Sequence, residues 1–190
     1  LPGAIPALVN LLNKGTYRGK KNAIVALFGL LLFPGNHPRV LATGIIPILI
    51  DLLIDEREDL VNDCVGVLAK IAERREGTKM ILRSSSDVLQ KLVQVLHSAS
   101  SRSGKEYSVS LMLFLCLNGG QKVIKQLDGL PLLMPSLYSI IAGGPPQASK
   151  KARTLINHIH QIYDQDQDQD QDHSISALTS PLHDQMVHAL

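Results

Sequence analysis

Two groups of side chains late in the sequence have types and spacing that could bind a metal ion. The run from Asp164 to Asp172 alternates Asp with Gln and places carboxylates at the first, third and fifth positions of a calcium-binding loop. That loop needs Gly at its sixth position and Glu at its twelfth, where this sequence has Gln169 and Ile175. His158 and His160 are two residues apart, which puts them on different sides of a helix. We therefore predict no metal site.

The sequence has none of the motifs that mark common catalytic sites. It contains no Gly-rich phosphate-binding loop, nucleophile elbow or nicotinamide-binding fingerprint. Its two cysteines, Cys64 and Cys116, lie far apart inside apolar stretches, which is typical of reduced core residues rather than of metal ligands or a disulfide framework. We expect no catalytic residue and no cofactor in this chain, and we expect a cytoplasmic or nuclear protein because its thiols are reduced.

Charge is distributed unevenly along the chain. All 19 lysine and arginine residues precede residue 154, whereas six of the 17 acidic residues follow residue 163. A basic body suggests an acidic protein partner. The basic clusters have no interleaved aromatic residues, which favours solvated helix ends over a nucleic-acid site. The longest apolar run, Ala23–Phe33, is far shorter than the roughly 20 residues of a membrane-spanning helix, so we expect no membrane span.

Internal repeats organise the rest of the sequence. The element Gly3-Ala-Ile-Pro-Ala-Leu-Val-Asn-Leu-Leu12 returns as Gly44-Ile-Ile-Pro-Ile-Leu-Ile-Asp-Leu-Leu53, and weaker copies span residues 86–96 and 129–137. The copies begin 41, 42 and 43 residues apart, within the range of about 40–47 residues that is typical of helical solenoids. The sequence begins with Leu1 rather than Met and the pattern is under way by residue 4, so we expect a fragment of a longer protein.

A second element recurs in register with the first. It spans residues 21–30, 62–71, 106–115 and 150–159, and apolar or small residues recur at relative positions 0, 3, 4 and 7. These residues are Ala23, Ala26, Leu27 and Leu30 in the first copy and Cys64, Val67, Leu68 and Ile71 in the second. Because such positions share one face of a helix, the pattern predicts a long helix with an inward apolar stripe in every copy.

Short helices are predicted in the gaps, at residues 37–42, 77–83 and 120–127. Pro6 and Pro47 stand where Pro is tolerated, in the first turn of the helix that follows Gly3 or Gly44. No segment alternates apolar and polar residues over the length of a strand, so we expect an all-α chain. We divide it into about four helical repeats over residues 1–163, the first one truncated, and an acidic low-complexity tail over residues 164–190 that we predict to be disordered.

The two repeated elements together resemble those of a known family. Its Gly-x-Ile-Pro-x-Leu-Val-x-Leu-Leu element, followed by Lys-x-Asn-Ala-x-x-Ala-Leu, is similar to the armadillo repeat. Residues 3–32 are similar to the C-terminal armadillo region of plant U-box E3 ubiquitin ligases. The resemblance covers residues 3 to about 163 and implies a right-handed superhelical armadillo-repeat solenoid, an α–α superhelix whose long third helices line a concave surface.

Exposed positions of that concave surface are the candidate protein-binding residues. Alignment of the long helices gives Asn22, Val25, Gly29, Asp63, Gly66, Lys70, Tyr107, Ser110, Phe114, Lys151, Thr154 and His158. Importin-like armadillo proteins hold basic import peptides with a ladder of Trp and Asn, which this sequence lacks. We therefore predict a folded or acidic protein partner, with Tyr107 and Phe114 as anchors. Alternatively, Phe114 packs against the next repeat.

The resemblance also implies a function. In the U-box family the U-box recruits the ubiquitin-charged conjugating enzyme, and the armadillo repeats hold the target, so that transfer depends on proximity. The chain would then be the substrate-recognition part of a ligase that binds a ubiquitination substrate or signalling partner, and it would meet the conjugating enzyme only through a U-box outside it. The alternatives are a stand-alone armadillo scaffold or adaptor without ligase activity and, more remotely, an enzyme with an unrecognised site.

Overall fold

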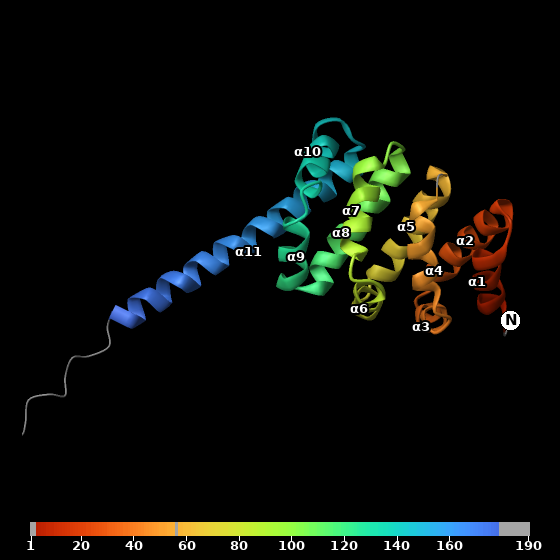
Figure 1. The fold of residues 1–190 in the computed structure, drawn as a ribbon, viewed down its shortest axis with the longest axis horizontal. Helices are drawn as coiled ribbons and strands as arrows, with labels where there is room; N and C mark the ends of the chain where they lie inside the picture. Colours follow the sequence, from red (N-terminus) through yellow and green to blue (C-terminus); the bar gives the residue numbers. More distant parts are fainter. Residues whose placement is uncertain (1–2, 56, 179–190) are drawn as a thin grey trace, which may run out of the picture.

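The chain folds into a stack of helices (Figure 1). The computed structural model describes residues 3–55 and 57–178, and these contain eleven α-helices, two short 3-10 helices and no strand. In chain order they are α1 (Ala4–Lys14), α2 (Tyr17–Leu31), η1 (Pro34–Asn36), α3 (His37–Leu41), α4 (Ile45–Asp51), η2 (Leu52–Ile54), α5 (Glu58–Ala72), α6 (Arg75–Ser84), α7 (Val88–Ser98), α8 (Arg102–Gly119), α9 (Gln121–Asp128), α10 (Leu133–Gly143) and α11 (Pro146–Leu178). The all-α class predicted from the repeats is confirmed for the described residues.

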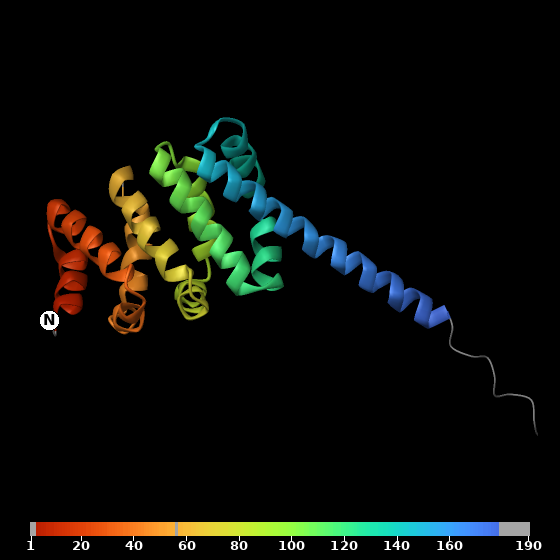
Figure 2. The ribbon, with the colours of Figure 1, turned by 180° about the vertical axis from the view of Figure 1, so that it is seen from behind.

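Three kinds of helix alternate along the stack. The long helices α2, α5, α8 and α11 come from the second repeated element, and each contacts the next, so they form one continuous layer. Helices α1, α4, α7 and α10 come from the first element, and α3, α6 and α9 are the predicted short helices. The two ribbon views show these units side by side along the long axis, from α1 to α11 (Figures 1 and 2).

Local sequence signals set where the long helices begin. The Thr16 side chain caps α2 by accepting a hydrogen bond of 3.3 Å from a backbone N–H of the first turn, and Ser101 caps α8 in the same way at 3.0 Å. Helix α5 begins with Glu58, where negative charge is stabilised by the helix dipole. The three long helices that form the site described below therefore start at locally encoded positions.

The inward stripe is buried as predicted in α5, but it differs in α2. Val67 and Ile71 on α5 are fully buried, whereas Ala26 at the equivalent place on α2 is exposed and Leu30 is only half-buried. Ile24 is fully buried instead. Among the described helices, α2 contacts another long helix, α5, on one side only. Its apolar stripe is therefore covered mainly where α1 and α5 pack against it, with smaller contacts from η1 and α3.

The last helix extends past the predicted repeats. Helix α11 continues to Leu178 and projects away from the stack in both ribbon views (Figures 1 and 2). Helical structure over residues 164–178 differs from the predicted disorder, and residues 179–190 lie outside the described residues. Extending an existing helix needs no new nucleation, so the Gln-Asp run can continue α11 although Asp, unlike Gln, is a weak helix former. The division of the chain at residue 163 stays a prediction.

None of the described helices is by itself long and apolar enough to cross a membrane. Helix α2 and the segment Pro34–Leu41 pass that test only as a pair, by length and composition, and the chain bends by 116° between them.

Candidate functional site

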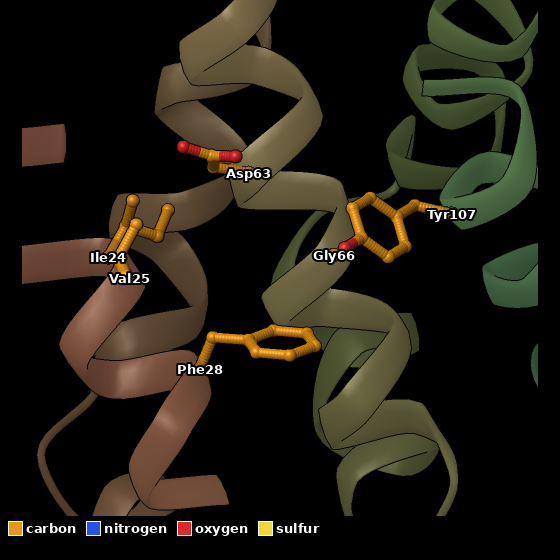
Figure 3. Close-up of a pocket in the computed structure, with 6 residues that line it drawn as sticks. All are labelled: Ile24, Val25, Phe28, Asp63, Gly66 and Tyr107. Atoms are coloured by element: carbon orange, nitrogen blue, oxygen red, sulfur yellow. The ribbon is translucent and has the colours of Figure 1, made fainter. Parts of the chain in front are cut away.

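The face formed by the long helices carries a pocket at α2, α5 and α8. It has a volume of about 200 Å³ and is lined by Ile24, Val25, Phe28, Asp63, Gly66 and Tyr107. Figure 3 shows Val25 and Phe28 on α2, Tyr107 reaching in from α8, and Gly66 between them on α5. The structure thus brings four of the predicted groove residues together in one place: Val25, Asp63, Gly66 and Tyr107.

Two aromatic rings meet across α5 and border the pocket. The ring centroids of Phe28 and Tyr107 are 6.1 Å apart and the ring planes are inclined at 48°, although α5 lies between the helices that carry them. Such a tilted arrangement is a favourable one for aromatic pairs. Gly66 permits the contact, because a Cβ atom there would lie 3.2 Å from two carbons of the Tyr107 ring. Gly66 is therefore the floor of the pocket.

A polar cluster borders the pocket near the start of the helices. The Lys21 ammonium donates a hydrogen bond to the Asp63 carboxylate and lies 3.3 Å from the Asp59 carboxylate. The Tyr17 hydroxyl donates to Asp59, and the Arg57 guanidinium lies 4.4 Å from the centroid of the Tyr17 ring. Desolvation lowers the pKa of Lys21, but the hydrogen bonds and charges of Asp63 and Asp59 outweigh it, so that the pKa is raised. Lys21 therefore stays charged and neutralises Asp63.

The other predicted groove positions lie outside the pocket. Ser110 is buried, and Lys151 on α11 donates a hydrogen bond of 2.7 Å to its hydroxyl oxygen. Phe114 is half-buried and packs against the core, as Tyr107 also does, so its role as an anchor or as a contact to the next repeat stays a prediction. Asn22, Gly29 and Thr154 are exposed, while Lys70 and His158 are half-buried. A binding role for the twelve positions stays a prediction, with Tyr107 as its best-placed aromatic anchor.

Two pocket residues, Ile24 and Phe28, were missed by the alignment of the repeats. The alignment selected three positions on each long helix, and neither residue occupies one of them. A signal for Phe28 was nevertheless present, because it follows Val25 by three residues and therefore lies on the same face of α2. Ile24 gave no such signal, since it is a fully buried residue whose edge reaches the pocket.

Cys64 and Cys116 are free thiols in the core, as predicted. Burial raises the pKa of each thiol to about 12, so both are protonated at neutral pH and are poor nucleophiles. Among the side chains that the structure describes, those of residues 3–55 and 57–162, no group of three or more His, Cys, Asp or Glu residues is placed to hold a metal ion.

Sequence comparison relates the chain to plant U-box proteins. It is 40% identical over 170 residues to U-box domain-containing protein 18 of Arabidopsis thaliana, which covers 86% of this chain and 24% of the relative. It is 38% identical over 168 residues to U-box domain-containing protein 19 of the same plant, with 85% and 24% covered. The chain therefore spans about a quarter of the length of these curated relatives. No family model matches the sequence.

Comparison with solved structures defines the class of fold. Designed armadillo repeat protein YIII(Dq)4CqI matches with a TM-score of 0.73 at 21% identity, over 83% of this chain and 65% of that one. A second designed armadillo repeat protein, in complex with peptide (KR)4, matches with a TM-score of 0.70 at 20% identity, over 83% and 64%. The protein is therefore an armadillo-repeat solenoid. More particularly, it is homologous over most of its length to plant U-box domain-containing proteins, as its repeat motifs predicted.

Proposed function

We propose that this chain is the substrate-recognition part of a U-box E3 ubiquitin ligase and that its groove holds the protein to be ubiquitinated. The homology to plant U-box proteins and the armadillo fold support this proposal. A U-box outside the chain recruits the conjugating enzyme that carries ubiquitin, while the repeats hold the target nearby. The contribution of this chain is proximity, because holding two reactants together raises their effective concentration.

The pocket at α2, α5 and α8 is the observation that carries the docking role. Val25 leaves 62% of its surface exposed there, beside the half-buried rings of Phe28 and Tyr107. Aromatic and apolar side chains in a concavity are where the binding energy of protein interfaces concentrates. The Lys21–Asp63 pair gives this apolar centre a polar border.

We also propose a cytoplasmic or nuclear location. Cys64 and Cys116 are free thiols packed in the core. Thiols in those compartments are kept reduced, whereas secreted domains use cysteine mostly in disulfides. A fluorescent fusion imaged in plant cells checks this location, and signal confined to a secretory compartment would contradict it.

A charge placed in the pocket tests the docking role. Val25→Glu puts a carboxylate among the apolar pocket residues without removing a core contact, since Val25 is exposed. Ile54→Glu is the matched control, because Ile54 is 78% exposed and lies on η2 beside α7, outside the pocket at α2, α5 and α8. Proteins captured by the chain from plant extract should be lost with Val25→Glu and kept with Ile54→Glu. Identical captured sets for wild type and Val25→Glu would show that the groove is not the docking surface.

Ubiquitin transfer is tested separately with a chimera. The U-box of U-box domain-containing protein 18, fused ahead of this chain, should ubiquitinate a captured target when activating and conjugating enzymes are supplied. The same chimera carrying Val25→Glu should lose that activity and keep its self-ubiquitination. Capture of a target that the chimera does not ubiquitinate would favour the alternative, a scaffold without ligase activity.

A further inference from the structure

Lys151 is a half-buried cation of the groove that has no acidic partner among the described side chains. It lies on α11, and its Nζ donates a hydrogen bond of 2.7 Å to Oγ of Ser110 on α8. That hydroxyl donates in turn to the backbone carbonyl of Glu106, at 2.5 Å. Lys21 and Lys70, at the same face, are each paired with a carboxylate, but no ion pair of the described residues includes Lys151. An ammonium group has three donors, so two remain for a ligand.

This ammonium group lies close to the apolar pocket. Ser110 follows Tyr107 by three residues on α8, a spacing that places Cβ atoms about 5–6 Å apart on one helix face. Tyr107 closes the pocket on the α8 side, and Lys151 reaches the same helix from α11. Adjacent helices pack about 8–10 Å apart, so the cation lies about one helix spacing from the pocket floor at Gly66. Along its length, the groove presents an apolar cavity and then a positive charge.

We propose that the groove binds an extended peptide segment that inserts one bulky apolar side chain into the pocket and places a carboxylate on Lys151. This inference rests on the proposed docking function and specifies its partner. An extended residue spans about 3.3 Å, so a helix spacing of about 8–10 Å corresponds to a step of about two to three residues from one anchor to the other. At about 200 Å³ the cavity is smaller than the roughly 300–1,000 Å³ of small-molecule sites and suits a single side chain.

Charge favours an acidic segment over a basic one. A designed armadillo protein of similar fold was solved with peptide (KR)4, which is basic. In this chain the carboxylate that lines the pocket, Asp63, is already neutralised by Lys21. A basic peptide would therefore find no uncompensated carboxylate in the pocket and would meet the ammonium of Lys151. A carboxylate at that place gains an ion pair in a half-buried setting, where screening by water is weaker than at an exposed surface.

Selection from a random library of peptides of about twelve residues, with the purified chain as bait, tests the proposal. Peptides bound by the wild-type chain should share a bulky apolar residue and, about two or three residues away, an Asp or Glu. Lys151→Glu should replace that acidic residue with Lys or Arg. Lys151→Met, which keeps the aliphatic stem, should abolish the acidic preference without creating a basic one. Lys79→Glu makes the same charge change at an exposed position of α6 and should leave the motif unchanged.

Fluorescence anisotropy with one selected peptide measures how much each substitution changes the binding affinity. Lys151→Glu should weaken its binding at least about tenfold, and Lys79→Glu should stay within about twofold of wild type. Thermal unfolding checks that each variant is folded. An acidic residue that persists in the peptides selected by Lys151→Glu and Lys151→Met overturns the carboxylate contact and leaves the docking role in place. A wild-type chain that selects no peptide beyond the level of Val25→Glu overturns the peptide proposal, and the docking role is then decided by the capture experiment with Val25→Glu.

Discussion

Gly66→Ala should stabilise this protein less than a Gly→Ala change normally stabilises a helix, because Tyr107 occupies the space that the new Cβ atom needs. That atom would lie 3.2 Å from Cδ2 and Cε2 of Tyr107, so the ring must move. Ala is more favourable than Gly in a helix interior by about 0.8–1.0 kcal/mol, while the displaced ring loses part or all of its contact with Phe28, worth about 0.5–1.5 kcal/mol. The two effects nearly cancel, and we expect the free energy of unfolding to change by no more than about 0.7 kcal/mol.

A double-mutant cycle with Tyr107→Ala isolates the steric effect. Without the ring, Gly66→Ala should gain the full amount of about 1 kcal/mol, so the two positions should be coupled by about 0.5–1.5 kcal/mol. Gly29→Ala is the control, because a Cβ atom there meets nothing within 4 Å, and its effect should be the same in both backgrounds. Urea unfolding followed by circular dichroism measures the free energies. If Gly66→Ala raised the free energy of unfolding equally with and without the Tyr107 ring, the packing of Tyr107 against Gly66 would be refuted.

Three further predictions concern pH and the core. His37 is 3% exposed, and desolvation lowers its pKa below the usual 6.5. The unfolded chain therefore binds a proton at this position more readily than the folded chain, and the melting temperature should fall as the pH drops through 6.5. His37→Gln should weaken this dependence of the melting temperature on pH. An unchanged dependence would show that another group causes it. The pKa of Glu58 is lowered to about 2, chiefly by the hydrogen bond from the Ser100 hydroxyl and by backbone N–H groups of the same loop. Its stabilising effect should be present above pH 4.5 and lost as the pH falls from 4.5 toward 2, and acid melting curves of Glu58→Gln that match wild type would contradict this. Leu27 is fully buried, so Leu27→Ala should lower the free energy of unfolding, measured in urea, by about 2–5 kcal/mol. Ala26→Ser, on the exposed side of the same helix, should lower it by less than about 0.5 kcal/mol. Equal losses would mean that the buried face of this helix is misassigned.

The sequence by itself determined the helices, their order and the fold. Two elements repeat in register every 41–43 residues, and each places apolar residues on one helical face. Such a face can be buried only against the equivalent face of a neighbouring repeat, so the period already implies a stack. The burial of Cys64 and Cys116 followed from the same pattern, because both lie within the apolar stripes of long helices.

Only the tertiary structure decided which side chains form the pocket. Phe28 and Tyr107 are far apart in the sequence and meet because α2 and α8 pack on either side of α5, where Gly66 leaves room for the Tyr107 ring. Ala26 is exposed although its equivalent on α5, Val67, is buried, since a second long helix covers only the latter. Periodicity determines which face of a helix is apolar, but it does not determine what covers that face. That depends on the packing of helices remote in sequence, and the binding surface depends on it as well.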